Sequence, residues 1–373
     1  MSLTDLPKEA LTARFAGPGK PFEFRAQRLP NLRDGEALLR VDCCTICGSD
    51  VRTIRGEREA PGSGLLGHEI TGHLIATADS GPITDVEGKP LNAGDRVICG
   101  VAVSCGECRY CRREIPQKCE RLLKFGHAGS GAGWELSGGL SDYCHLPRGA
   151  TLVRVPESLR PREAAWIGCA GATAAAAIRT AGPLSGQTVL ILGTGALGLF
   201  VAGMAASAGA EVLAVDFRKD RLGVARSLGV ASCLQLRQGD DGALQDELIQ
   251  TFAKDHTGGR GVDIVLETSG SRAVVGTALG TVDLGGRVIL VGSVAPSDPV
   301  DFYPEKIVRG LIRIEGVHNY IPRDLKTATD FMSENPSVLA SLGADFPVLG
   351  LREIDKAFEL AQIGDHLRVA IEP

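Results

Sequence analysis

The sequence predicts an α/β protein in which repeated strand–helix units build a parallel sheet beside a second, β-rich region. In residues 170–317, four short apolar segments, "QTVLIL", "EVLAVD", "VDIVLET" and "GRVILVG", alternate with helical segments such as "ALGLFVAGMAAS" and "RKDRLGVARSLG". Strands that are apolar throughout are typical of a sheet covered on both faces, and strand–helix alternation is typical of βαβ units. A glycine-rich turn directly after the first strand also favours this fold.

The regions on either side of this sheet differ from it. Residues 1–169 contain short β-like runs, such as "EALLRVD" and "DRVICGVAV", between loops rich in glycine and proline. Residues 318–373 contain a helical segment, "LREIDKAFELAQIG", and an extended one, "HLRVAIEP", and they are expected to return to the first region. The predicted domains are therefore 1–169, 170–317 and 318–373.

Composition and charge exclude several classes of protein. A net charge of −5 gives no general attraction to nucleic acid or to an anionic membrane surface. The N-terminal segment contains acidic residues and no apolar core, so it is not a signal peptide, and a cytoplasmic location is expected. Residues 189–210 carry no charge and are long enough to span a bilayer, but glycines interrupt them at Gly193, Gly195 and Gly198 and no basic flank frames them. A buried strand–turn–helix is the better interpretation.

The glycine-rich turn, "VLILGTGALGLF", has the pattern of a dinucleotide-binding loop. Gly193 permits the tight turn, Gly195 lets backbone amides approach a pyrophosphate, and Gly198 lets the helix pack against the strand. Ala196 and Leu197 would begin that helix beside the phosphates. A glycine-rich turn without a ligand is the alternative interpretation.

The next strand ends in an acidic residue, which favours NAD over NADP. Asp216 follows the last glycine by about 20 residues, where a carboxylate can bind both adenosine ribose hydroxyls and repel a 2′-phosphate. Arg218 is the one neighbouring feature that favours NADP.

The segment "CGECRYCRREIPQKC" holds four cysteines: Cys105, Cys108, Cys111 and Cys119. Eleven cysteines without a secretory signal indicate a reducing compartment, which disfavours disulfides. An iron–sulfur cluster would serve electron transfer, and nothing else in the sequence indicates a one-electron partner. A zinc ion with four thiolate ligands has no open coordination position, so this lobe (residues 99–122, approximately) is predicted to be structural.

Three other segments supply residues able to bind a second metal ion. They are "CTICGSD" with Cys47, "LLGHEITG" with His68 and Glu69, and "WIGCAGATAA" with Cys169. Alone, each cysteine is compatible with a small core residue and the histidine with a structural one. Together they would give a site with two thiolates and one imidazole.

In this order, "CGSD", "GHE", the four-cysteine lobe, "GCAGAT", "GTGALG" and "HLRVAIEP" resemble the zinc-containing medium-chain alcohol dehydrogenases over nearly the whole chain. Within the family, the chain resembles polyol- and threonine-dehydrogenase-like members, with a branch associated with phosphonate catabolism as the alternative. The resemblance implies a GroES-like β-rich catalytic domain, completed by the C-terminal segment, and a Rossmann coenzyme domain with the active site between them. It also implies a homodimer or homotetramer that acts on a small molecule.

The resemblance further implies a role for each motif residue. Cys47, His68 and Cys169 would bind a catalytic zinc, and Glu69 would act as a transient ligand. Asp50 would orient the zinc-bound imidazole, and Ser49 would bind the substrate oxygen and accept its proton. The implied coenzyme contacts are Thr173 near the nicotinamide, Arg221 at the adenosine ribose and Arg368 at the pyrophosphate.

The implied reaction is hydride transfer between an alcohol and NAD, which gives an aldehyde or ketone. Zinc lowers the pKa of the bound hydroxyl, and the protein aligns the two reactants. Many family members carry a histidine three residues after the serine, where this chain has Arg52. A guanidinium cannot act as a base, so the proton must leave through water or another group.

The substrate is the least specified part of the prediction. Pocket positions suggested by the resemblance are Val101, Leu140, Ser293 and His318, with His127 and Trp134 on the loop after the zinc lobe. Arg52, Arg55 and Arg58, with Lys124, would bind a phosphate, phosphonate or carboxylate, unless they form only a solvated basic loop. A secondary, polyol or cyclitol alcohol and an anionic alcohol both fit, and the segment around these arginines resembles, more faintly, a branch associated with phosphonate breakdown.

Two other function classes remain open. The chain could be an NADPH-dependent reductase of activated double bonds, as zinc-free relatives are, but that chemistry does not need the three metal-binding residues. It could instead be a non-catalytic sensor of zinc and NAD, which Ser49 beside an open metal site disfavours.

Overall fold

The computed structural model describes residues 7–60, 62, 64–78, 83–127, 133–301, 303–342 and 346–373. The chain divides into two compact units. The first comprises residues 1–172, 321–333 and 344–373, and the second comprises residues 173–320 and 334–343. Each unit has its own sheet and its own apolar core.

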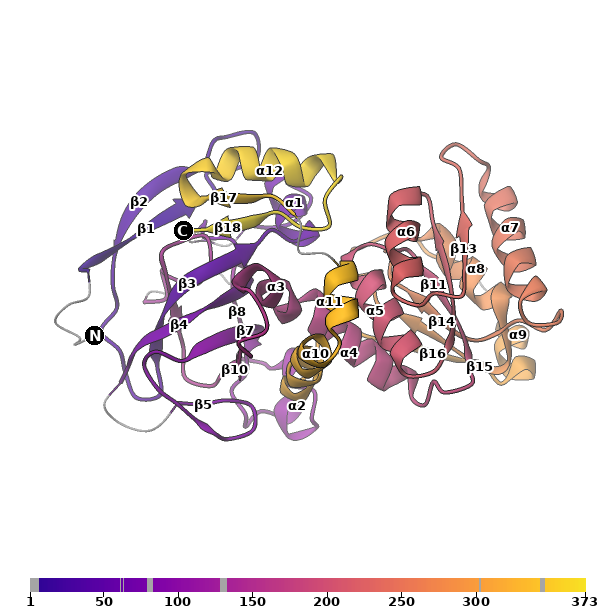
Figure 1. Cartoon of the computed structure of the whole chain (residues 1–373), viewed down its shortest axis with the longest axis horizontal. Helices are drawn as coiled ribbons and strands as arrows, with labels where there is room; N and C mark the ends of the chain where they lie inside the picture. The colour runs from indigo at the N-terminus through magenta and orange to yellow at the C-terminus, as the bar shows by residue number, and fades with distance from the viewer. Residues whose placement is uncertain are drawn as a thin grey trace. The chain divides into compact units, whose positions relative to one another are not determined.

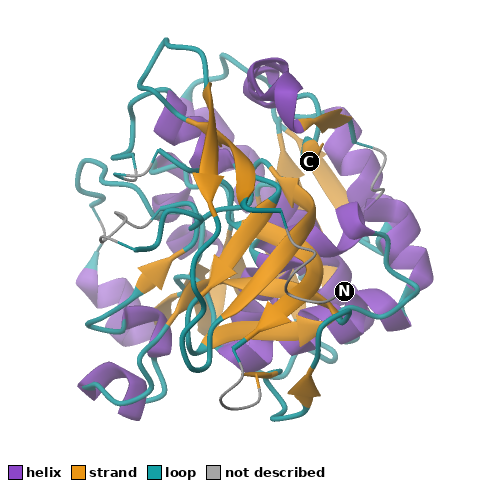
Figure 2. Ribbon diagram, turned by 90° about the vertical axis from the view of Figure 1, so that its left-hand side faces the viewer, coloured by secondary structure: helices purple, strands orange, loops and turns teal. Residues whose placement is uncertain are grey.

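An eight-stranded sheet, drawn in orange in Figure 2, forms the centre of the first unit. Its main path runs β10 (Ala150–Arg154), β7 (Arg96–Val103), β4 (Glu69–Thr77), β3 (Ala37–Thr45), β18 (Ala370–Glu372) and β17 (Val348–Gly350). Two further strands, β8 (Leu123–Lys124) and β9 (Tyr143–Leu146), pair with β7 and β3. Two hairpins lie outside it: β1 (Glu9–Arg14) with β2 (Glu23–Arg28), and β5 (Ile83–Thr84) with β6 (Pro90–Leu91).

The C-terminal segment is part of this sheet. The strand β18 pairs antiparallel with β3, Ala370 opposite Thr45, so the yellow C-terminal strands lie beside the purple N-terminal ones in Figure 1. Helix α12 (Ile354–Ile363) packs on the same core, where Phe358 stacks on Phe22 with ring centroids 5.0 Å apart. The other helices of this unit are α1 (Gly48–Ile54), α2 (Arg109–Arg112), α3 (Pro161–Ala165) and α10 (Pro322–Glu334), with 3-10 turns η2 (Pro116–Lys118), η3 (Trp166–Gly168) and η4 (Leu351–Glu353).

The second unit is built on a six-stranded sheet whose strands are all parallel. Its order is β13 (Ser232–Gln235), β12 (Glu211–Asp216), β11 (Thr188–Leu192), β14 (Val262–Glu267), β15 (Val282–Leu290) and β16 (Arg313–Gly316). Its helices are α5 (Ala196–Ser207), α6 (Lys219–Ser227), α7 (Gly242–Asp255), α8 (Ala273–Thr281), α9 (Pro304–Gly310) and α11 (Pro336–Leu342), and α4 (Ala170–Ala181) links the two units. The strand order reverses at β11, and in such sheets ligands bind at the carboxyl edge beside that strand.

The uncharged stretch from residue 189 forms β11, a turn and α5, as predicted. Its apolar character reflects burial, because β11 is buried along most of its length and most of α5 is also buried. Within the described part of the chain, none of the helices combines the length and apolar character that a bilayer crossing needs.

Candidate active site and metal centres

Three of the predicted site residues, Cys47, Ser49 and Asp50, lie at the start of α1. Cys47 precedes the helix, and its backbone N–H donates to Oδ2 of Asp50 at 2.9 Å. A carboxylate in the first turn satisfies a free backbone donor and interacts favourably with the helix dipole. The Cys47 thiol and the buried Asp50 carboxylate are therefore held within one turn of helix.

His68 approaches the same carboxylate from the start of β4. Its Nδ1 lies 3.4 Å from Oδ1 of Asp50, and both side chains are almost completely buried. With Nδ1 directed at a carboxylate, Nε2 is the ring nitrogen left for a metal ion, which is the usual arrangement of metal-bound histidines.

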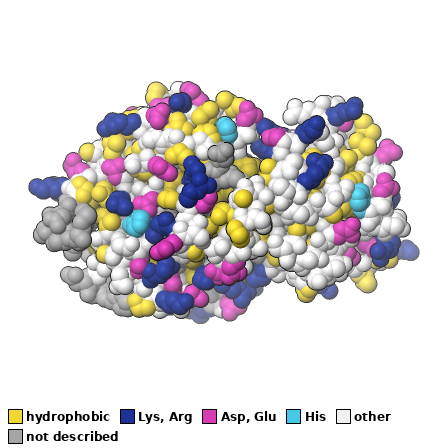
Figure 3. All heavy atoms as spheres, viewed as in Figure 1, with side chains coloured by type: hydrophobic (Ala, Val, Ile, Leu, Met, Phe, Trp, Pro, Cys, Tyr) yellow, Lys and Arg dark blue, Asp and Glu magenta, His cyan; other side chains and the backbone are white. Residues whose placement is uncertain are grey.

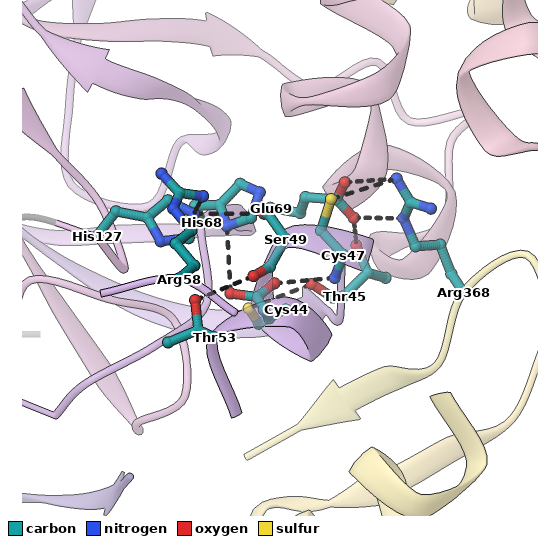
Figure 4. A network of polar contacts seen from close by, with 11 residues as sticks. Cys44, Thr45, Cys47, Ser49, Thr53, Arg58, His68, Glu69, His127 and Arg368 are labelled. Atoms are coloured by element: carbon teal, nitrogen blue, oxygen red, sulfur yellow. Dashed lines mark hydrogen bonds and ion pairs between the residues drawn. The ribbon is translucent and has the colours of Figure 1, made fainter. Parts of the chain in front are cut away.

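Glu69, the first residue of β4, is the centre of a buried ion pair. Arg368 donates from Nε to Oε2 and from Nη2 to Oε1 of Glu69, both at 2.8 Å, and the Thr45 hydroxyl donates to Oε2 at 2.5 Å (Figure 4). The guanidinium also lies over the Trp166 ring, 5.9 Å from its centroid. Arg368 is thus bound to a candidate zinc ligand, and its predicted contact with a coenzyme pyrophosphate stays a prediction.

The structure brings together four candidate ligands of the predicted catalytic zinc. The ligand atoms of Cys47, His68, Glu69 and Cys169 all lie within 4.8 Å of one another, although they come from three distant segments. Cys169 reaches the group from the position between η3 and α4. Two thiols and one imidazole form a donor set that suits zinc and leaves a fourth position, which the carboxylate could occupy during ligand exchange.

The electrostatics of this group favour a bound cation. The hydrogen bond between the Cys47 and Cys169 thiols has opposite effects on the two groups. It holds the pKa of Cys47 well below its usual value and raises the pKa of Cys169 well above it. Burial by itself lowers the pKa of His68, but Asp50 and Cys47 outweigh it and raise the pKa to about 10. Burial also raises the pKa of Glu69 to about 7, against the opposing effect of Arg368. These groups stabilise positive charge at their centre, as a metal-binding set should.

Ser49 contacts a histidine on a different segment. Its Oγ lies 3.4 Å from Nε2 of His127, and Nη1 of Arg58 lies 3.4 Å from the same nitrogen (Figure 4). Because a guanidinium only donates hydrogen bonds, Nε2 must be the unprotonated acceptor. Burial, followed by the cations of His68, Arg58 and Lys124, holds the pKa of His127 far below its usual value. The imidazole beside Ser49 is therefore neutral.

The other predicted substrate residues are not all directed at this site. Nε of Arg52 lies 3.6 Å from Glu57, and Arg55 donates to the carbonyl of Gln362 at 3.2 Å. Val101 and Leu140 are buried, at 3% and 1% exposure, and Leu140 belongs to the apolar core of the first unit. His318 belongs to the second unit.

The four cysteines of the predicted structural lobe form a separate group around one point. All eleven cysteines lie in the described residues and are free thiols. Within the lobe, the Sγ atoms of Cys108 and Cys111 are 3.5 Å apart, those of Cys105 and Cys111 are 3.9 Å apart, and those of Cys108 and Cys119 are 3.9 Å apart. Thiolates about 2.3 Å from a tetrahedral zinc lie about 3.8 Å from one another, so the group fits one zinc ion.

The glycines of the dinucleotide loop meet three different demands. Gly193 has a φ of 98°, and a Cβ there would lie 2.8 Å from that of Ser269. A Cβ on Gly198 would lie 1.9 Å from the Gly193 carbonyl oxygen, whereas one on Gly195 would meet nothing within 4 Å. The first and third glycines therefore serve close packing, and the second leaves open space at the start of α5, next to Ala196 and Leu197.

The Asp216 carboxylate is fixed at the end of β12. Its Oδ2 accepts from the Thr194 N–H at 2.6 Å and from the Thr194 hydroxyl at 2.9 Å, and its Oδ1 accepts from the Arg218 N–H at 2.8 Å. The Arg218 guanidinium turns to Asp220, with contacts of 3.0 and 2.8 Å. Arg221 lies on α6, and Thr173 lies on α4.

One buried acidic residue at the carboxyl edge of the six-stranded sheet was missed by the sequence analysis. Glu267 ends β14 completely buried and accepts hydrogen bonds from Ser269 Oγ at 2.8 Å, Gly270 N at 2.6 Å and Ser293 Oγ at 2.9 Å. It thereby joins the loops that follow β14 and β15. The available signal was an acidic residue at the end of an otherwise apolar strand.

Comparison with known proteins identifies the class that this fold and these sites define. A model described as an alcohol dehydrogenase GroES-like domain matches residues 33–157, and one described as a zinc-binding dehydrogenase matches residues 196–334. An alcohol dehydrogenase of Geobacillus stearothermophilus is 30% identical over 84% of this chain and 86% of its own length. A second alcohol dehydrogenase of the same organism is 26% identical over 92% of this chain and 93% of its own length.

A solved structure points to the same class. An alcohol dehydrogenase of Thermotoga maritima superposes with a TM-score of 0.88 at 27% identity, over 98% of this chain and 99% of its own. The chain belongs to the zinc-containing medium-chain alcohol dehydrogenase family, which confirms the predicted resemblance, the predicted α/β fold class and the assignment as a zinc-dependent enzyme.

Proposed function

We propose that the protein oxidises an alcohol to an aldehyde or ketone with NAD, at a catalytic zinc held by Cys47, His68 and Cys169. The observation that carries this proposal is the convergence of these ligand atoms within 4.8 Å, beside the hydroxyl of Ser49. Zinc, when bound there, supplies a Lewis acid that lowers the pKa of an alcohol hydroxyl.

The chain's own groups have distinct tasks in this reaction. Asp50 orients the His68 ring, and Ser49 binds the substrate hydroxyl and accepts its proton. Glu69 supplies a fourth donor for ligand exchange, while Arg368 and Thr45 hold it beside the thiols. Since His127 stays neutral and Arg52 is directed at Glu57, we expect water to take the proton from Ser49.

The coenzyme preference follows from Asp216 and its surroundings. A fixed carboxylate at the end of β12 can accept hydrogen bonds from two ribose hydroxyls, and it repels a 2′-phosphate. Arg218, the feature that favoured NADP in the sequence, is paired with Asp220. Both observations support NAD as the hydride acceptor, bound with its pyrophosphate at the open space beside Gly195.

A second, structural zinc and a homo-oligomer complete the proposal. The sulfur separations of 3.5 to 3.9 Å in the four-cysteine lobe support the second zinc. The edge strand β16 and the neighbouring α9 expose apolar side chains: Val308 at 72%, Leu311 at 74% and Ile314 at 40%. An unpaired edge with exposed apolar residues supports association with a second copy of the chain.

The proposal can be tested with a panel of neutral, polyol, cyclitol and anionic alcohols, followed by NADH absorbance with NAD or NADP. We expect NAD-linked oxidation and two zinc ions per chain by metal analysis. Consumption of NADPH with an enone, without alcohol oxidation, would identify a double-bond reductase. Binding of zinc and NAD without any turnover would instead identify a sensor.

A further inference from the structure

We infer that Arg58 and Lys124 form a binding site for an oxyanion group of the substrate, beside Ser49. The inference rests on the proposed alcohol oxidation and specifies its substrate: a short alcohol that carries a phosphate, phosphonate or carboxylate. Three observations carry it: the direction of Arg58, the surroundings of Lys124 and the short distance of Arg58 from Ser49.

Of the three arginines in this segment, Arg58 is directed at the site. Its Nη1 contacts the same His127 nitrogen that contacts Ser49, each at 3.4 Å, so Arg58 and Ser49 are two hydrogen-bond lengths apart at most (Figure 4). Arg52 is paired with Glu57, and Arg55 is bound to a carbonyl of α12. No carboxylate of a described residue lies within 4 Å of the Arg58 guanidinium.

Lys124, at the end of β8, is a partly buried cation whose charge interacts with those of Arg58, Cys169 and Cys47. Burial lowers its pKa, Arg58 lowers it further, and Cys169 and Cys47 act in the opposite direction. Among the residues described, none offers Lys124 a carboxylate within 4 Å. A partly buried ammonium group without a counter-ion is unfavourable, and an arriving anion would relieve that cost.

The contact with Arg58 occupies the His127 nitrogen that faces Ser49 and leaves the anion to these two cations. Nε2 of His127 accepts from Arg58 and therefore cannot donate to an oxyanion, while among the described groups its buried Nδ1 has no hydrogen-bond partner. The guanidinium has further N–H groups in a fork that matches the oxygens of a phosphate or carboxylate, and Lys124 adds a point charge.

The geometry also limits the length of the substrate. The hydroxyl must lie at Ser49 and the zinc ligands, and the anion must lie at Arg58, so only a few bonds can separate the two groups. A neutral alcohol would leave both cations without a counter-ion, and the site should therefore discriminate against it.

A matched set of three-carbon substrates tests this inference with the zinc-loaded protein. The set is 1,2-propanediol, its 1-phosphate, 2-hydroxypropylphosphonate and lactate, which share a hydroxyl at the second carbon and differ in the charged group. In the wild type we expect the anionic substrates to have the higher kcat/KM. Arg58→Gln should lower the ratio of anionic to neutral kcat/KM by roughly tenfold to hundredfold, through KM, and Lys124→Met should act in the same direction.

The matched control is Arg55→Gln. Arg55 lies three residues before Arg58 and carries the same charge, but its side chain is bound to the carbonyl of Gln362. It should leave the anionic-to-neutral ratio unchanged. Arg58→Lys should recover part of the ratio, because it restores the charge without the fork. The ranking of phosphate, phosphonate and lactate identifies which oxyanion the site accepts.

A binding measurement separates this inference from the proposed reaction. Inorganic phosphate and methylphosphonate should raise the Tm of the zinc-loaded wild type and of Arg55→Gln, and not that of Arg58→Gln. If this shift appears while no alcohol is oxidised, the anion site stands and the proposed reaction fails. The inference is overturned if the neutral diol has the same kcat/KM as its charged analogues and the Tm shift does not depend on Arg58. An equal loss for neutral and anionic substrates in Arg58→Gln also overturns it, because Arg58 would then only position His127.

Discussion

Asp50 performs two tasks with its two oxygens. One oxygen accepts the backbone N–H that begins α1, and the other lies 3.4 Å from the imidazole of His68. The position of the Cys47 thiol and the orientation of the His68 ring therefore depend on the same carboxylate. Such partners of metal ligands contribute to metal affinity because they fix the ligand and increase its basicity.

We predict that Asp50→Asn lowers the affinity of the catalytic site for zinc by about 10- to 100-fold. The amide oxygen can still accept from the Cys47 N–H, so α1 should form normally, but the charge beside His68 is lost. The measurement is zinc retained per chain during competition with a chelator. Asp142→Asn is the control, because Asp142 also accepts a backbone N–H, that of Leu11 at 2.8 Å, and belongs to none of the candidate metal-binding groups among the described residues. Equal zinc retention in both variants and the wild type would contradict this role.

At the scale of elements, the four-cysteine lobe is held together by few regular hydrogen bonds. It contains only the short helix α2 and the turn η2 between β7 and β8. Backbone N–H groups of Cys105, Cys108 and Arg121 donate to cysteine sulfurs at 3.3 to 3.4 Å, as expected for thiolates. In such a segment, the free energy of metal binding replaces that of a hydrophobic core.

Replacement of one lobe cysteine should therefore remove a zinc ion and destabilise the fold. We expect Cys111→Ser to lower the zinc content from two to one per chain and the Tm by about 5 °C or more. The control is Cys233→Ser, in β13, whose thiol belongs to neither cysteine group. Metal analysis and thermal unfolding measure the two effects. Unchanged zinc content in Cys111→Ser would show that the lobe does not bind the metal.

The strands of the second unit differ in how well the sequence predicts them. The four apolar segments form β11, β12, β14 and β15. The outer strands β13 and β16 lack a continuous apolar pattern: β16 reads "RIEG" and is exposed along its length. Edge strands have one partner and less covered surface, so local hydrophobicity does not indicate them.

For the molecule as a whole, the face drawn in Figure 3 has no single dominant charge. Lysine and arginine side chains are interspersed with aspartate and glutamate on the face shown in Figure 3, which agrees with the small net charge. The exposed apolar residues of α9 and β16 differ from this surface, since Val308, Leu311 and Ile314 are all accessible.

A charge placed on that edge should weaken self-association. We predict that Val308→Glu shifts the protein toward the monomer in sedimentation velocity, because a carboxylate would have to be desolvated in the interface. Leu244→Glu is the matched control, since Leu244 is an exposed apolar residue of α7, at 43% exposure, away from β16. A wild-type protein that is already monomeric, or equal effects of both changes, would contradict an interface at this edge.

Local sequence patterns were enough to predict the α/β class, the glycine turn and the residue types of both cysteine-containing sites. These features are local: strand hydrophobicity, the demand for glycine at Gly193 and Gly198, and the short spacing of the lobe cysteines are all readable within a few residues. Contacts between side chains that are distant in the sequence could be identified only from the tertiary structure. It pairs Glu69 with Arg368, directs Arg58 toward Ser49 and turns Arg52 and Arg55 away, because side-chain direction depends on packing between segments far apart in the chain.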